Sequence, residues 1–265
     1  MRVSITSPSN AKLKIARNLH SRAGIMKHGF FLMEGPRFVA DYLSRETPLL
    51  ILVSDTAGRL SGTVASEAAG MKIRVIEIPD KLFSDISDTQ TSQGIAAVCP
   101  LPSVNIHDIP REGVFLLLDG ISDPGNMGTI IRSAAAFGCT AIVTSKGSCC
   151  PFTPKVTRAA AGWNSEVPII FDTDLAGFMQ RNSNEMEFIG ADASGGDVDV
   201  LLGLEGCLGL VIGSEACGIG EETRKQCSGM VALKMPGGVE SLNAAVSASI
   251  LLYETTKHLG SGAKT

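Results

Sequence analysis

The sequence predicts an α/β protein in two parts, the second of them built on a mostly parallel sheet. Short apolar runs alternate with helical patterns along the chain. Runs in the second half, such as VFLLLD at 114–119, are continuously apolar rather than alternating, which is typical of strands covered on both faces. Between the halves, PLPSVNIHDIPREG at 100–113 contains three prolines, which disfavour regular structure and indicate a linker.

Residues 1–100 are predicted to form the smaller α/β domain. A helix is expected at 10–22, and a second at 36–45, where Pro36 stands at a position that helix starts accept. Helices alternating with strands over this length make a small α/β sandwich. Its strands are expected at 49–54, 72–78 and 94–100.

The second half is predicted to carry helical segments between several of its strands, which makes the sheet mostly parallel. In such sheets, ligands gather at the carboxyl ends of the strands. The expected strands are 114–119, 141–145, 187–193, 208–215 and 230–235.

The bulk composition is that of an ordinary globular protein. Of 265 residues, 44% are hydrophobic and 19% charged. No apolar run reaches the roughly 18 residues that span a bilayer, and the N-terminus lacks the apolar stretch of a signal peptide, so a cytoplasmic protein is expected. Seven cysteines without a C-x-x-C pair and four scattered histidines favour neither a disulfide framework nor a metal site.

Charge is distributed unevenly along the chain. The net charge is −4, but residues 1–37 contain seven Lys or Arg and one Glu, which gives +6 and leaves −10 for the remainder. This asymmetry favours a local contact with a polyanion. The solvated face of an amphipathic helix is an equally good explanation of this feature taken alone.

The segment DGISDPGNMGTIIRSAAAFG at 119–138 combines a turn with a helix made for burial. Pro124-Gly125 is expected to make the turn, Gly128 to let the backbone approach a ligand, and Gly138 to end the helix. An arginine reaching solvent from a simple strand–turn–helix would also explain this pattern. The polar exceptions are Asn126 and Arg132, and the residues expected to be buried are Ile130, Ile131, Ala134, Ala135 and Phe137.

The segment LVIGSEACGIGEE at 210–222 places a carboxylate, Glu215, just after a strand. The spacing is G-x-E-x-x-G from Gly213 to Gly218 and lacks the G-x-G-x-x-G of dinucleotide-binding folds, which disfavours a nicotinamide-binding Rossmann protein. The carboxylate can orient a cation or cap the next helix.

The segment LKMPGGVESLNAAVSASILLYE at 233–254 is read as a loop followed by a helix. Ser241 is a candidate N-cap, and Asn243 is an amide in the first turn of a helix that is otherwise apolar. Satisfaction of backbone groups near the helix start would also account for this amide. The residues expected to be buried are Leu242, Ala245, Val246, Ile250 and Leu252.

Taken in order, the N-x-G-x-x-x-R segment, the G-x-E-x-x-G loop and the E-S-L-N helix start resemble the three motifs of the SpoU/TrmH family. These are RNA ribose 2′-O-methyltransferases of the SPOUT superfamily, and the resemblance covers about residues 112–257. The first half resembles the family's substrate-binding domain through N-x-K-L-K near the start, FFLMEGPRFV at 30–39 and SQGIAAV at 92–98.

The resemblance implies an RNA-binding domain at 1–100, a linker at 101–112 and a methyltransferase domain at 113–265. The last of these would carry a deep trefoil knot that binds S-adenosylmethionine. It also implies a homodimer whose site borrows from the partner subunit, with no metal and no membrane. The implied cofactor-binding residues are Gly213, Leu233 and Leu242, with Ala191 and Asp192 as further candidates.

The implied catalytic residue is Arg132. It serves either as a base for the 2′-hydroxyl or as a group that positions phosphate and stabilises a developing alkoxide. The second role is physically easier, because a guanidinium does not lose its proton near neutral pH. The residues implied to hold the arginine and the substrate in place are Asn126, Glu215, Ser241 and Asn243.

RNA is the implied substrate, with large-subunit rRNA favoured over tRNA. A non-catalytic RNA-binding or ribosome-assembly protein is the alternative. Two positions depart from the family pattern, because Ser214 stands where asparagine is common and Lys234 where proline is usual. The candidate RNA contacts are Lys12, Lys14, Arg17, Arg22, Arg37 and Arg158.

Overall fold

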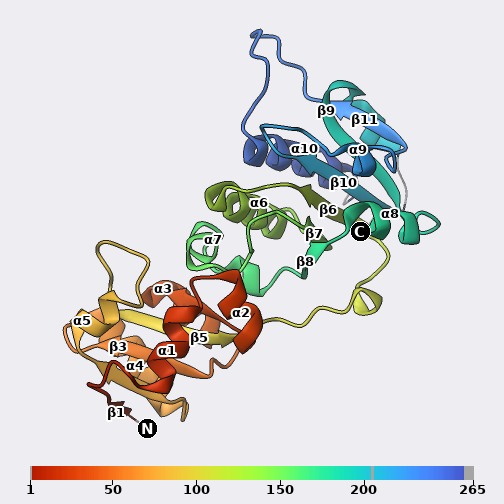
Figure 1. Cartoon of the computed structure of the whole chain (residues 1–265). Helices are drawn as coiled ribbons and strands as arrows, with labels where there is room; N and C mark the ends of the chain where they lie inside the picture. Colours follow the sequence, from red (N-terminus) through yellow and green to blue (C-terminus); the bar gives the residue numbers. More distant parts are fainter. Residues whose placement is uncertain (1, 204–205, 260–265) are drawn as a thin grey trace, which may run out of the picture. The chain divides into compact units, whose positions relative to one another are not determined.

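The computed structural model describes residues 2–203 and 206–259. The chain divides into two compact units, whose course along the sequence can be followed by colour in Figure 1. The first unit comprises Met1–Pro102 together with Phe152–Gly162, and the second comprises Ser103–Pro151 and Trp163–Thr265. A short segment from the middle of the chain therefore belongs to the N-terminal unit.

The first unit is built on a five-stranded mixed sheet in the order β1-β4-β3-β5-β2. The central strand β3 is buried along its whole length and runs parallel to β4 and antiparallel to β5. This full burial explains why its sequence is continuously apolar. The strands are β1 (Arg2–Ser4), β2 (Phe30–Glu34), β3 (Leu50–Ser54), β4 (Val75–Ile78) and β5 (Ile95–Pro100).

Helices cover this sheet. The single helix expected at 10–22 is instead two helices, because the Ser21 side chain caps a new helix by accepting a hydrogen bond from Gly24 N. Phe152 lies against Phe31 of β2, with ring centroids 5.5 Å apart, and α7 packs on the same strand. The helices are α1 (Ala11–Asn18), α2 (Arg22–His28), α3 (Pro36–Leu43), α4 (Arg59–Gly70), α5 (Asp80–Ser84) and α7 (Pro154–Ala159).

The second unit contains a six-stranded sheet in the order β11-β9-β10-β6-β7-β8. All of its strand pairs are parallel, which confirms the mostly parallel sheet expected from the apolar runs. Strand β8 was not predicted, because most of its residues are only half-buried and its sequence, IIFDT, is short. The strands are β6 (Gly113–Asp119), β7 (Ala141–Ser145), β8 (Ile169–Thr173), β9 (Glu187–Asp197), β10 (Cys207–Gly213) and β11 (Gly229–Ala232).

Both faces of this sheet are covered. On one face α10 lies along α6 and contacts β6 and β10, while on the other α8 joins a buried cluster with Phe115, Leu117 and Val143. Burial on two sides explains the continuously apolar strands. The helices are α6 (Pro124–Ala136), α8 (Leu175–Asn182), α9 (Glu221–Arg224) and α10 (Ala244–Leu259), with short 3-10 turns at η1 (Ile106–Asp108), η2 (Trp163–Ser165) and η3 (Val198–Gly203).

The start of α6 differs from the expectation. Pro124 and Gly125 do not form a separate turn but begin the helix, because the Asp123 carboxylate accepts a hydrogen bond from Asn126 N at 2.8 Å and Pro124 needs no donor there. Gly128 is buried within α6. Gly138 follows the helix with a φ of 70°, a left-handed conformation that suits glycine at a helix end.

The start of α10 also differs. Asn243, rather than Ser241, caps the helix, since its Oδ1 accepts hydrogen bonds from Ala245 N at 2.9 Å and Val246 N at 3.3 Å. Val246 and Ile250, expected to be buried, are 45% and 37% exposed. Helical periodicity marks an apolar face but does not say what covers it.

Candidate active site

The loops that follow β6, β10 and β11 lie at one edge of the second sheet, because the carboxyl ends of parallel strands share an edge. Three of the predicted residues meet there. Asn243 Nδ2 donates to Asn126 Oδ1 at 2.9 Å, and Asn126 Nδ2 donates to Glu215 Oε1. The same Glu215 oxygen accepts from Ala244 N at 3.4 Å. The structure therefore joins the three segments in one hydrogen-bonded set.

The backbone fixes both asparagines. Asn126 lies in the first turn of α6, which Asp123 caps, and Asn243 is itself the cap of α10. Because Asn243 Oδ1 faces the α10 amides, its Nδ2 is directed to Asn126. Helix capping and the orientation of the site are thus performed by the same side chain.

The loop that carries Glu215 is narrow and held at both ends. Ser214 and Gly218 exchange two backbone hydrogen bonds, and Gly220 N donates to the Asp119 carboxylate at 2.9 Å. A Cβ added to Gly213 would lie 2.1 Å from the carbonyl carbon of Gly218, so only glycine fits there.

Beside these residues lies a cavity of ≈ 560 Å³, within the usual range for small-molecule sites. Ile212, Val231 and Leu251 contribute apolar surface. Of the titratable side chains that line it, three are carboxylates and one is a lysine, so the cavity suits a ligand with a positive centre. All five predicted cofactor-binding residues line it, namely Gly213, Leu233, Leu242, Ala191 and Asp192, and so do Glu215 and Ser241.

An ion pair that the sequence did not reveal lies at the wall of the cavity. Arg224 Nη1 of α9 contacts Asp192 Oδ2 at 2.5 Å, and Ser194 N and Oγ donate to the other carboxylate oxygen. The Arg224 and Ser194 hydrogen bonds lower the pKa of Asp192 to about 2. No spacing in the sequence signals this contact, because it joins residues of two separate elements.

The departure at position 234 has a structural partner. Lys234 Nζ forms an ion pair with the Asp197 carboxylate at the end of β9, which lowers the pKa of Asp197. The pair is exposed on the lysine side, so its contribution to stability is small. Ser214, the other departure, accepts a hydrogen bond from Cys217 N through its hydroxyl at 3.2 Å.

Arg132 is not part of this set. It is exposed on α6 and has no hydrogen-bond or ion-pair partner in the described part of the chain. Six residues separate it from Asn126, which in an α-helix is a rotation of about 240° and a rise of about 9 Å. Ser241 is exposed at the cavity, likewise without a hydrogen-bond partner among residues 2–203 and 206–259.

The candidate RNA contacts all lie in the first unit. Arg17 pairs with Asp85 at 3.3 Å, and Arg158 of α7 pairs with Asp88 at 3.0 Å. The remaining four are exposed or half-exposed on α1, α2 and α3, namely Lys12, Lys14, Arg22 and Arg37. The described residues contain neither a group of three potential metal ligands nor a helix long and apolar enough to cross a membrane.

Comparisons with known proteins agree with this geometry. Residues 113–253 match the model of the SpoU rRNA Methylase family, and residues 10–97 match the MRM3-like substrate binding domain. The 23S rRNA (guanosine(2553)-2′-O)-methyltransferase RlmP of Bacillus subtilis is 29% identical over 251 residues, covering 94% of this chain and 97% of that protein.

Two solved structures of RNA methyltransferases resemble this chain in fold. A putative RNA methyltransferase of the TrmH family from Porphyromonas gingivalis superposes with a TM-score of 0.76 at 28% identity, covering 93% of this chain and 97% of that one. The AdoMet-bound rRNA methyltransferase from Sinorhizobium meliloti shares the fold, with a TM-score of 0.81 at 24% identity over 97% and 98% of the two chains.

The match to the SpoU rRNA Methylase family puts the parallel α/β unit, with the ligand cavity at its carboxyl edge, in the class of RNA methyltransferases. The chain belongs to the SpoU rRNA Methylase family. This confirms the family resemblance found in the three loop segments.

Proposed function

We propose that this protein transfers the methyl group of S-adenosylmethionine to a ribose 2′-hydroxyl in large-subunit rRNA. The observation that carries the proposal is the cavity of ≈ 560 Å³ flanked by the bonded set of Asn126, Glu215 and Asn243. Relatives named as 23S rRNA guanosine-2′-O-methyltransferases support the choice of rRNA.

The cavity suits this cofactor, which when bound supplies a methyl group activated by a sulfonium. Leu233 and Leu242 offer apolar walls for the adenine, while the carboxylates of Glu215 and Glu240 favour a cation. Gly213 lines the cavity with its backbone, since glycine has no side chain. Since the methyl is already activated, the protein has mainly to align the acceptor oxygen with it.

The bonded set supplies that alignment. Asn126 and the α10 amide of Ala244 hold the Glu215 carboxylate in one orientation. Arg132 has five N–H donors in a fixed plane, which suits contact with an RNA phosphate or with the negative charge that develops on the 2′-oxygen. Ser241 lines the cavity and, in this proposal, contacts the substrate.

A homodimer would bring Arg132 to this site from the partner subunit. Val246, Ile250 and Tyr253 are exposed at helical spacing on α10, and the Tyr253 ring lies 5.6 Å from that of Phe137 at the end of α6. An apolar stripe of this kind on a folded unit favours a protein partner. A second copy covering it would form a symmetric interface of α6 and α10.

The chain path supports the deep trefoil knot. Strand β11 is at one edge of the sheet, yet the following helix α10 packs on the two central strands, β6 and β10. It also packs on α6. The segment after β11 therefore returns past β9 and β10. Residues 1–100 act as the RNA-binding domain in this proposal, 101–112 as linker and 113–265 as the methyltransferase domain, with the cytoplasm as the site of action.

Titration calorimetry with S-adenosylmethionine, followed by methyl transfer to 23S rRNA, tests the proposal. Wild-type protein and an Arg132→Ala variant should bind the cofactor equally, but only wild type should methylate RNA. Absence of cofactor binding in the wild type would instead indicate a non-catalytic RNA-binding protein.

A further inference from the structure

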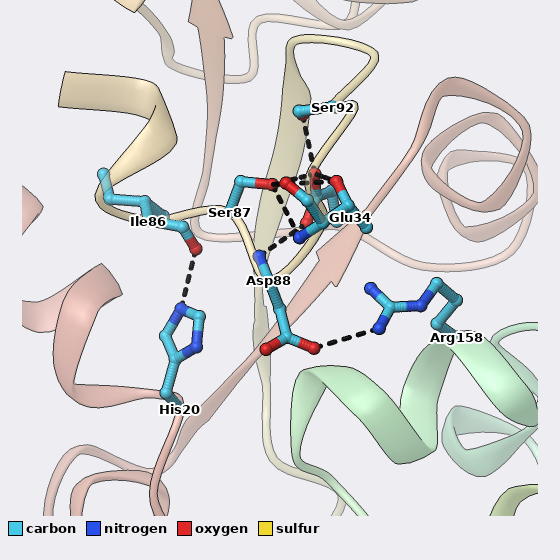
Figure 2. Close-up of polar contacts among 8 residues, drawn as sticks. His20, Glu34, Ile86, Ser87, Asp88, Ser92 and Arg158 are labelled. Atoms are coloured by element: carbon cyan, nitrogen blue, oxygen red, sulfur yellow. Dashed lines mark hydrogen bonds and ion pairs between the residues drawn. The ribbon is translucent and has the colours of Figure 1, made fainter. Parts of the chain in front are cut away.

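Glu34, at the end of β2, is the centre of a polar cluster in the first unit (Figure 2). Its Oε1 accepts hydrogen bonds from Ser87 Oγ at 2.6 Å, Ser92 Oγ at 2.7 Å and Thr89 Oγ1 at 3.0 Å. Its Oε2 accepts from Asp88 N at 3.2 Å. Four donors from one loop, residues 85–93, therefore converge on a single half-buried carboxylate.

The same loop pairs with two arginines that come from distant parts of the sequence. Asp85 contacts Arg17 of α1 at 3.3 Å, and Asp88 contacts Arg158 of α7 at 3.0 Å. Both arginines are candidate RNA contacts. Loop 85–93 thus contacts both Arg17 and Arg158, which are 141 positions apart in the sequence.

The Arg158 side chain is 40% exposed, whereas that of Asp88 is 19% exposed, so the guanidinium faces solvent with the carboxylate behind it. Helix α7 buries Val156 and Thr157 and exposes Lys155 one turn before the arginine. A guanidinium has five N–H donors, and a single contact with Asp88 leaves others for a phosphate.

We propose that Asp88, held by Glu34, is a positioning residue that aims Arg158 at the RNA backbone. The inference rests on the proposed function, because it needs RNA as the substrate. A carboxylate near a polyanion is unfavourable through charge alone. The presence of this carboxylate beside a candidate RNA-contacting arginine is explained if fixing the guanidinium gains more RNA affinity than the negative charge loses.

Removing the negative charge of Asp88 should raise RNA affinity, whereas releasing the Arg158 guanidinium should lower it. These opposite effects make Asp88→Asn the decisive variant. If Asp88 only adds negative charge, the variant should bind RNA more tightly. If Asp88 positions Arg158, the variant should bind about threefold more weakly. The matched control is Glu77→Gln, which removes the carboxylate of another arginine pair in the same unit, Arg2–Glu77 at 2.5 Å, and should not weaken binding.

The measurement is the dissociation constant of the full chain for in vitro transcribed, unmodified 23S rRNA across a salt series. Arg158→Ala should weaken binding about threefold to tenfold and lower the salt slope by about one. Glu34→Gln should weaken binding in the same direction as Asp88→Asn. In methyl transfer, Asp88→Asn and Glu34→Gln should both raise the KM for RNA and leave kcat and cofactor affinity unchanged.

A charge swap distinguishes a role of the Asp88–Arg158 ion pair in positioning the arginine for RNA from a role in stabilising the folded unit only. The double variant Asp88→Arg with Arg158→Asp should restore the ion pair and the melting temperature but not the RNA affinity. Wild-type RNA affinity in the swap, or tighter binding by Asp88→Asn, would overturn the inference. If the wild type transfers no methyl group but still binds RNA more tightly than Asp88→Asn, Glu34→Gln and Arg158→Ala, the proposed function fails and the positioning role stands.

Discussion

Asn243 Nδ2 donates a 2.9 Å hydrogen bond to Asn126 Oδ1, across 117 residues of sequence. Asn126 lies in the first turn of α6 and Asn243 caps α10, so this bond joins the starts of the two helices that lie together on one face of the sheet. Through Asn126 it also reaches Glu215. The relationship links the packing of the second unit to the geometry of its candidate active site.

Asn243→Asp separates the two roles of this side chain. Aspartate caps a helix as well as asparagine does, so the free energy of unfolding should fall only by about 1 kcal/mol, the contribution of the lost hydrogen bond to Asn126. The donor to Asn126 is lost and a carboxylate is placed near Glu215, so kcat should fall by about tenfold or more. Unfolding curves and single-turnover kinetics measure the two effects. Full activity in this variant would show that the bond does not serve catalysis.

Ile250→Asp tests the proposed homodimer. The side chain is 37% exposed, so the charge should cost the folded subunit little, but it would be buried in the interface. Analytical ultracentrifugation should show a dimer for wild type and a monomer for the variant, with methyl transfer lost along with the dimer. Leu60→Asp, at a residue 53% exposed in the first unit, is the control. A dimeric Ile250→Asp protein would rule out this surface.

Cysteine reactivity should follow exposure. Cys217 is exposed beside Glu215, whereas desolvation, together with Cys150 and Asp123, raises the pKa of Cys149 to about 12. The thiolate is the reactive form, so an alkylating reagent at pH 8 should modify Cys217 well before Cys149. Mass spectrometry of peptides over time measures both rates. Equal rates at the two cysteines would contradict the difference in exposure between the partly buried Cys149 and the exposed Cys217.

Asp192 should make stability depend on acid pH. Its pKa is lowered to about 2 by Arg224 and Ser194, so its contribution is present above the ordinary aspartate value and is lost as the pH falls towards 2. Asp192→Asn should therefore be less stable than wild type at pH 7, and the difference should shrink from about pH 4 downwards. Urea unfolding at a series of pH values tests this. A constant difference down to pH 3 would count against the Asp192–Arg224 pair.

The sequence predicted the second sheet well because its strands are buried on both faces and therefore apolar throughout. Strand β1 escaped prediction because its three residues are exposed, and β8 because it is mostly half-buried. The outward face of α10 was misjudged, since Val246 and Ile250 have the same spacing as core residues.

Part of the candidate site could be predicted from the sequence, and part could not. Local patterns placed Asn126, Glu215 and Asn243 after strands, and parallel topology brought them together. The pairing of Arg224 with Asp192, and of Arg158 with Asp88, depends on tertiary packing that no local pattern contains.

The central claim is tested most directly by incubating the purified chain with labelled S-adenosylmethionine and unmodified 23S rRNA, then digesting the RNA to nucleosides. The proposed function predicts label in a 2′-O-methylated nucleoside with wild-type protein and none with Arg132→Ala. Label in a base-methylated nucleoside, or equal label with both proteins, would contradict it.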